Sequence, residues 1–159
     1  MAIHKLHLED FDEIDYDLIA IHTSLEDYRL AFKLNQNLAI SLCKNEAEIP
    51  IEVKEKVAHF SRFTFEDDQQ MMVWDLIQNK QKIDLPVQDL QANLFENKNF
   101  TRRISLVSEL KKVDYFLKIE HDPQFIVKDI INKINKIDSI SAVYEVNATE
   151  MKSKNNLIF

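Results

Sequence analysis

The alternation of apolar and polar positions along the chain predicts both strands and helices. The run LIAIH at residues 18–22 is continuous and apolar, which is typical of a buried strand. Apolar residues then recur at helical spacing as far as about Leu38, and LAISLC at 38–43 predicts the next strand. The apolar stripe of this helix comprises Leu25, Tyr28, Ala31, Phe32 and Leu38.

Strand signals dominate residues 57–119. FSRFTF at 60–65 and MMVWDLI at 71–77 flank the acidic turn EDDQQ and predict a hairpin. RISLV at 103–107 and VDYFLKI at 113–119 predict two further strands.

A second helix is predicted in DPQFIVKDIINKINKI, residues 122–137. Asp122 suits the N-cap and Pro123 the first helical position. SAVYEVNA at 141–148 predicts a final strand. The order strand–helix–strand over residues 113–146 predicts a crossover connection, which is right-handed if the two strands are parallel.

These elements fit one α+β domain over residues 1–159: a largely antiparallel sheet, or a mixed one, with two main helices packed against it. The length is that of an ordinary domain, and 45% hydrophobic residues can fill its core. Residues 81–99 are expected to form a long internal connection. Residues 152–159 are expected to be a frayed tail, although their apolar end could dock.

The chain contains no glycine. Glycine is required where the backbone needs positive φ or must approach a ligand closely, so P-loops, dinucleotide fingerprints, nucleophile elbows and calcium loops are excluded. Turns with positive φ are therefore expected to use Asn and Asp.

The net charge of −7 makes nucleic acid a disfavoured partner, because an acidic chain repels phosphates unless its basic residues cluster. An RNA-associated protein remains an alternative if the basic residues of the C-terminal half form one stripe. That stripe would comprise Arg102, Arg103, Lys128, Lys133 and Lys136.

The single cysteine, Cys43, cannot form an internal disulfide and is expected to be a small buried hydrophobe on a strand. The N-terminal residues resemble no signal peptide, and no apolar run is long enough to span a bilayer. A cytoplasmic location without membrane attachment is therefore expected.

The turn between the first strand and the first helix is one candidate site. Thr23 stands three residues before Glu26, which predicts a capping box in which each side chain bonds the other residue's backbone N–H. The alternative is an anion or ligand site formed by His22, Thr23, Ser24 and Glu26 at the helix N-terminus. The capping interpretation is favoured.

No metal site, cofactor or catalytic group is predicted. His4 and His7 would face opposite sides of a strand, and no third ligand is near them in sequence. No combination of acid, base and nucleophile emerges from the chain.

The stretch SLVSELKKVDYFLKIE at residues 105–120 predicts a hairpin with Glu109 in its hinge. Alternation places Tyr115 in the core, on the same face as Val113, and leaves Asp114 on the other face. We expect Asp114 to pair across the strands with a basic residue such as Arg102 or Arg103.

Glu109, Val113, Asp114 and Tyr115 also resemble the signature of the IPExxxVDY family of small bacterial proteins. Val107 and Ser108 stand where the signature has Ile and Pro. The stretches IHTSLEDYRLAFKLN and WDLIQNK are similar to that family too, so the resemblance covers most of the chain. It implies no activity, because none is assigned to the family.

The function favoured by these observations is a non-enzymatic module that binds another protein. One alternative is a small-molecule or anion-binding protein, or an enzyme, with a pocket at His22–Glu26. The other is the RNA-associated protein described above.

Overall fold

The computed structural model describes residues 16–86, 99–121 and 125–159, and it confirms the predicted α+β fold. The central sheet has six strands in the order β10-β1-β9-β6-β5-β2, and every neighbouring pair is antiparallel. These strands are β1 (Tyr16–Thr23), β2 (Cys43–Lys44), β5 (Arg62–Asp67), β6 (Met72–Gln78), β9 (Tyr115–Glu120) and β10 (Ile140–Val146). The hairpin expected from β5 and β6 is confirmed.

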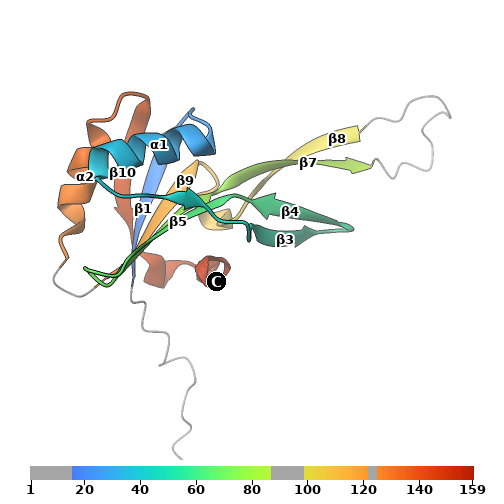
Figure 1. The fold of residues 1–159 in the computed structure, drawn as a ribbon. Helices are drawn as coiled ribbons and strands as arrows, with labels where there is room; N and C mark the ends of the chain where they lie inside the picture. Colours follow the sequence, from blue (N-terminus) through green and yellow to red (C-terminus); the bar gives the residue numbers. More distant parts are fainter. Residues whose placement is uncertain (1–15, 87–98, 122–124) are drawn as a thin grey trace, which may run out of the picture.

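Two helices cover one face of this sheet (Figure 1). They are α1 (Asp27–Leu38) and α2 (Val127–Asn135). Strands β9 and β10 are both antiparallel to β1, which lies between them, so they run in the same direction. The segment β9–α2–β10 is therefore the expected crossover, with one strand inserted between its two strands.

Alternation along the strands supplies two apolar cores. In β1, Ile19 and Ile21 face the helices, whereas Leu18 and Ala20 face the opposite side. All four are fully buried. The second core is closed by C-terminal residues such as Leu157.

The buried face of α1 differs from the expected stripe. Leu30, Ala31 and Leu34 are buried, whereas Tyr28 and Phe32 are 54% and 61% exposed. The stripe was wrong about the aromatic residues because α1 meets the sheet along the Leu30–Leu34 line and turns Tyr28 and Phe32 to solvent. In α2 the structure places the N-cap at Ile126; Asp122 and Pro123 lie outside the described residues.

Two hairpins extend from the sheet on the side away from α2 (Figure 1). One pairs β3 (Ile49–Val53) with β4 (Lys56–Phe60), and the other pairs β7 (Lys80–Pro86) with β8 (Asn99–Ser105). The long connection expected at 81–99 is therefore wrong for residues 81–86 and 99, which form strands, and residues 87–98 lie outside the described part. Pairing with residues 13 or more positions away stabilises these segments, and local pattern does not reveal that.

Three further local expectations were wrong. The strand expected at 38–43 reduces to β2, and Cys43 is exposed at the sheet edge. The C-terminal tail is not frayed; its apolar end docks, as the alternative allowed, with a 3-10 turn at Lys154–Leu157 (η4) and Leu157 fully buried in the second core. Among the described residues, the positive-φ positions are Ala39, Lys54, Met71 and Ser139, none of them Asn or Asp.

Candidate functional site

The stretch around Glu109 does not form the expected hairpin. Strand β8 pairs with β7, and β9 lies between β1 and β6 in the central sheet. The residues between β8 and β9 form a compact connection with a 3-10 turn at Ser108–Leu110 (η2), and Glu109 lies in this turn. The hairpin interpretation failed because both edges of β9 are occupied by other strands.

Asp114 joins three separate parts of the fold immediately before β9. One carboxylate oxygen accepts the backbone N–H of Thr23 at 2.9 Å, and the other accepts the ammonium group of Lys80 at 2.7 Å. A basic partner was expected, but neither Arg102 nor Arg103 supplies it. The pairing connects the end of β1 with the first residue of β7.

Tyr115 lies in the core beneath α1, as expected. Its side chain is buried, and its hydroxyl donates a hydrogen bond of 2.9 Å to the carbonyl of Leu25. Burial raises the pKa of the Tyr115 phenol above its ordinary value, and nearby carboxylates, foremost Asp27, raise it further. Val113 was wrongly assigned to the same face: it packs in the second core, because it precedes the strand and does not follow its alternation.

Glu109 attaches the C-terminal segment to this connection. Its carboxylate accepts the backbone N–H of Ser153 at 2.8 Å and the Ser153 hydroxyl at 2.6 Å. The Ser108 hydroxyl donates a third bond at 3.0 Å. The bond from the Ser153 hydroxyl is the largest cause of a lowered pKa at Glu109, about 2.

Asn79, which sequence reasoning missed, organises the whole connection from within. It is fully buried; its amide nitrogen donates to the carbonyls of Leu110 and Val113 at 2.9 and 2.8 Å, and its oxygen accepts Val107 N–H at 2.9 Å. Its backbone also bonds Leu106 and Asp114. The only signal in the sequence was an Asn between two apolar strands, in the segment QNK at 78–80. Glu109, Asp114, Tyr115 and Asn79 each bond segments that are distant in the sequence, and these four residues are here called the clamp.

The predicted capping box at Thr23 and Glu26 is absent. Helix α1 begins at Asp27 with Glu26 as its N-cap, and no side-chain capping bond is formed. The Thr23 hydroxyl instead donates to the carbonyl of Ser139 at 2.6 Å and accepts Leu25 N–H at 3.2 Å. Thr23 is the last residue of β1, so it is too early in the chain to cap the helix.

The four residues proposed as a ligand site do not converge. His22 contacts Tyr144 on β10, with a hydrogen bond of 3.0 Å and ring stacking at 5.6 Å. Thr23 is buried and has hydrogen-bond partners, and Ser24 is exposed. Glu26 lines a pocket whose lining includes none of His22, Thr23 and Ser24.

The basic residues of the C-terminal half do not form one stripe. Arg102 and Arg103 lie on β8, whereas Lys128 and Lys133 lie on α2 and Lys136 directly follows it. These two elements are at opposite ends of the molecule (Figure 1).

The hairpin β7–β8, here called the arm, instead gathers its own positive charge. Lys82 is directly opposite Arg103 in the register, so both side chains lie on the same face. Both are exposed, and neither forms an ion pair with a described residue.

No set of three or more His, Cys, Asp and Glu side chains in residues 16–86, 99–121 and 125–159 is arranged to hold a metal ion. His4 and His7 lie outside these ranges. None of the helices in the described part is long and apolar enough to cross a membrane.

Comparison with known proteins gives no match: no family model, no curated protein and no solved structure is similar to this chain. The resemblance to the IPExxxVDY family therefore rests on the motif residues and the two flanking stretches alone.

Proposed function

We propose that this protein is a non-enzymatic interaction module whose arm binds an acidic segment of another protein. The observation that carries the proposal is the pair Lys82 and Arg103, placed directly opposite one another with no ion-pair partner among the described residues. Like charges in this position destabilise a pair of strands. Carboxylates of a bound partner relieve that repulsion and gain two ion pairs.

The surroundings of the pair keep this face positive. Thr101 donates a 2.6 Å hydrogen bond to the carboxylate of Asp84, the acid two residues from Lys82. Lys56, from the neighbouring β4, bonds the backbone carbonyl of Asp84 on the β7 side of the arm. An acidic ligand therefore meets two cations, Lys82 and Arg103, and one carboxylate that already accepts a hydrogen bond.

The backbone of the arm suits an extended partner. The arm is a sheet of only two strands, and β8 has no strand on its outer edge among the described residues. Two-stranded sheets are marginally stable in water, and a third strand adds backbone hydrogen bonds. Phe100, 64% exposed on β8, offers an apolar contact to such a strand. The partner is thus an extended acidic segment with an apolar residue near one end.

Nucleic acid is a weaker fit to the same surface. The net charge of −7 opposes a phosphate backbone, and the lysines of α2 are too distant to add to the arm. A cytoplasmic location, expected from the sequence, belongs to this proposal.

The proposal is tested by fluorescence polarisation with two labelled peptides, one alternating Glu with Val and the other alternating Lys with Val. The Glu peptide is expected to bind, and the Lys peptide is not. The double variant Lys82→Glu/Arg103→Glu should weaken binding of the Glu peptide at least about tenfold, because two ion pairs become repulsions. The control Lys128→Glu/Lys133→Glu makes the same change in net charge at the distant helix α2. It should change the affinity for the Glu peptide about twofold at most.

Equal loss of binding in both double variants would mean that net charge, rather than the arm, attracts the peptide. Equal binding of both peptides, or none of either, contradicts the proposal as well. A single-stranded RNA oligonucleotide that binds more tightly than the Glu peptide, with a steep dependence on salt, would favour the RNA-associated alternative.

A further inference from the structure

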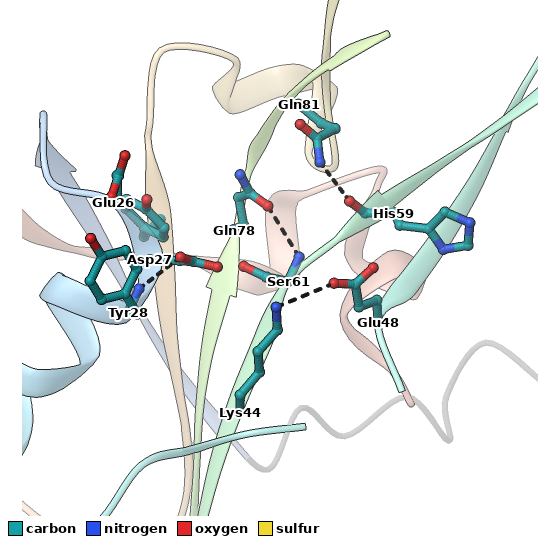
Figure 2. Close-up of a pocket in the computed structure, with 10 residues that line it drawn as sticks. Glu26, Asp27, Tyr28, Lys44, Glu48, His59, Ser61, Gln78 and Gln81 are labelled. Carbon is teal, nitrogen blue, oxygen red and sulfur yellow. Dashed lines mark hydrogen bonds and ion pairs between the residues drawn. The ribbon is translucent and has the colours of Figure 1, made fainter. Parts of the chain in front are cut away.

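A polar pocket of about 540 Å³ lies between the start of α1 and the bases of the two hairpins (Figure 2). Its lining combines Asp27 and Tyr28 of α1 and the N-cap residue Glu26 with Glu48, Ser61 and Gln78 of the opposite wall. The volume is within the range of small-molecule sites, which is about 300–1,000 Å³. This pocket is separate from the basic face of the arm.

Ser61 carries a buried hydroxyl that has no hydrogen-bond partner among the described residues. The residue is 5% exposed, and its side-chain oxygen forms no hydrogen bond with any described residue. The backbone N–H of Ser61 bonds the amide oxygen of Gln78 at 3.1 Å, which fixes the residue in place. Figure 2 shows the hydroxyl directed into the pocket, on the side where Asp27 lies. Buried hydroxyls nearly always have a partner, and the pocket is the place from which one can reach this hydroxyl.

The charges around this hydroxyl are mostly negative. Lys44 is the one lysine or arginine among the lining residues, and it pairs with Glu48 at 3.7 Å. Glu26 and Asp27 form no ion pair with a described residue. One oxygen of Asp27 accepts Tyr28 N–H at 2.7 Å, which leaves its second oxygen for a ligand.

We infer that this pocket binds a small organic cation, of the primary-amine class, through Ser61 and the carboxylates of Asp27 and Glu26. An ammonium group donates hydrogen bonds to oxygen acceptors, and Ser61 and the second oxygen of Asp27, which lie near each other in Figure 2, supply two of them. Glu26 adds a further negative charge to the lining. A metal ion fits less well, because the described acids are not clustered tightly enough to coordinate one. Anions are disfavoured by the same carboxylates.

The clamp holds the acidic wall in position for such a ligand. Asp114 bonds Thr23 N–H, and Tyr115 bonds the carbonyl of Leu25, so the backbone leading into Glu26 is fixed at two points. Fixed acceptors bind a cation without an ordering cost at the moment of binding.

The inference is tested by isothermal titration calorimetry of the full chain with putrescine and spermidine, and with glutarate as a dianion of similar length. The amines are expected to bind and glutarate is not. Ser61→Ala and Asp27→Asn should each weaken amine binding about tenfold, because each removes a hydrogen bond or a charge at the ammonium group. Asp27→Asn keeps an oxygen for Tyr28 N–H, so α1 is retained.

Two controls separate this site from general charge effects. Asp68→Asn removes one exposed acid in the β5–β6 turn and should change amine affinity about twofold at most. The midpoint temperature of thermal unfolding of unliganded Ser61→Ala should equal or exceed that of the wild type. The reason is that the lost hydroxyl has no hydrogen-bond partner among the described residues. The arm variant Lys82→Glu/Arg103→Glu should bind amines normally, so failure of the arm proposal leaves this one intact.

The inference is overturned if neither amine binds at about 10 mM, which corresponds to an affinity too weak for a built site. Equal weakening by Asp27→Asn and Asp68→Asn, or normal amine binding by Ser61→Ala, also overturns it. Tighter binding of glutarate than of spermidine would reverse the assigned charge preference.

Discussion

The carboxylate of Asp114 accepts the backbone N–H of Thr23 at 2.9 Å, so the last residue of β1 is bound to the residue that precedes β9. Lys80 bonds the other oxygen at 2.7 Å. One side chain therefore connects the central sheet, the turn into α1 and the base of the arm.

Replacement of Asp114 tests this connection. Asp114→Ala should lower the free energy of unfolding by about 1–3 kcal/mol, because the N–H of the buried Thr23 loses its partner. Lys80→Met removes only the ion pair, whose lysine side chain is 40% exposed, and should cost less than about 1 kcal/mol. Urea denaturation of both variants gives the comparison. Equal costs would show that the ion pair, rather than the Thr23 bond, carries the effect.

Two substitutions of Tyr115 separate the contribution of its hydrogen bond to stability from the contribution of its packing. Tyr115→Phe should cost about 1 kcal/mol, because the carbonyl of Leu25 loses its donor. Tyr115→Ala should cost roughly 3–5 kcal/mol through the cavity left under α1. The exposed Tyr28 is the matched control, and Tyr28→Ala should change unfolding free energy by about 0.5 kcal/mol or less. A Tyr115→Ala variant as stable as the control would refute the core position.

Asn79 should be among the most sensitive polar positions of the described chain. Asn79→Ala leaves the Val107 N–H and two carbonyls without their side-chain partner, and should cost about 3 kcal/mol or more. Asn37→Ala is the control, because that exposed side chain bonds only within α1; it should change stability by about 0.5 kcal/mol or less. Denaturant unfolding measures both. A small effect at Asn79 would mean that water replaces its bonds.

The lowered pKa of Glu109 predicts that the stability of the fold decreases at acidic pH. Its folded pKa of about 2 is below the ordinary 4.5, so its contribution is present above pH 4.5 and is lost as the pH falls toward 2. Because Glu109 is exposed, the contribution should be less than about 1 kcal/mol. The stability difference between wild type and Glu109→Gln, measured by urea denaturation, should shrink between about pH 5 and pH 2. A difference that stays constant or widens over this range contradicts the Ser153 contact.

The like charges of Lys82 and Arg103, which face each other across the arm, predict a stabilising substitution. Lys82→Glu converts a repulsive cross-strand pair with Arg103 into an attractive one, and should raise the free energy of unfolding by about 0.2–1 kcal/mol. Arg102→Glu makes the same change in charge one residue away, opposite Ile83, and should give no such gain. If both variants are equally stable, the Lys82–Arg103 repulsion is already relieved in the free protein.

The local pattern of apolar and polar residues was enough to predict those strands and helices in which the spacing of apolar residues fixes the buried face. The run at Leu18–His22 alternates between two buried faces, and the apolar spacing of α2 places Ile130 and Ile134 in the core. The β5–β6 hairpin also follows from two adjacent apolar strands and a short acidic turn. In each case neighbouring residues carry the whole signal, because strand and helix periods fix which side chains share a face.

Beyond the β5–β6 hairpin, tertiary structure decided which strands pair, and it decided which groups the polar side chains bond. Strand β8 pairs with β7 rather than β9, Asp114 finds Lys80 from 34 residues away, and Glu109 finds Ser153 from 44 residues away. Asn79 and Ser61 gain their significance only from the groups around them, one fully bonded and the other facing a pocket without a partner. The physical reason is that a polar side chain has no preferred partner until packing brings one within hydrogen-bond reach and excludes water from both.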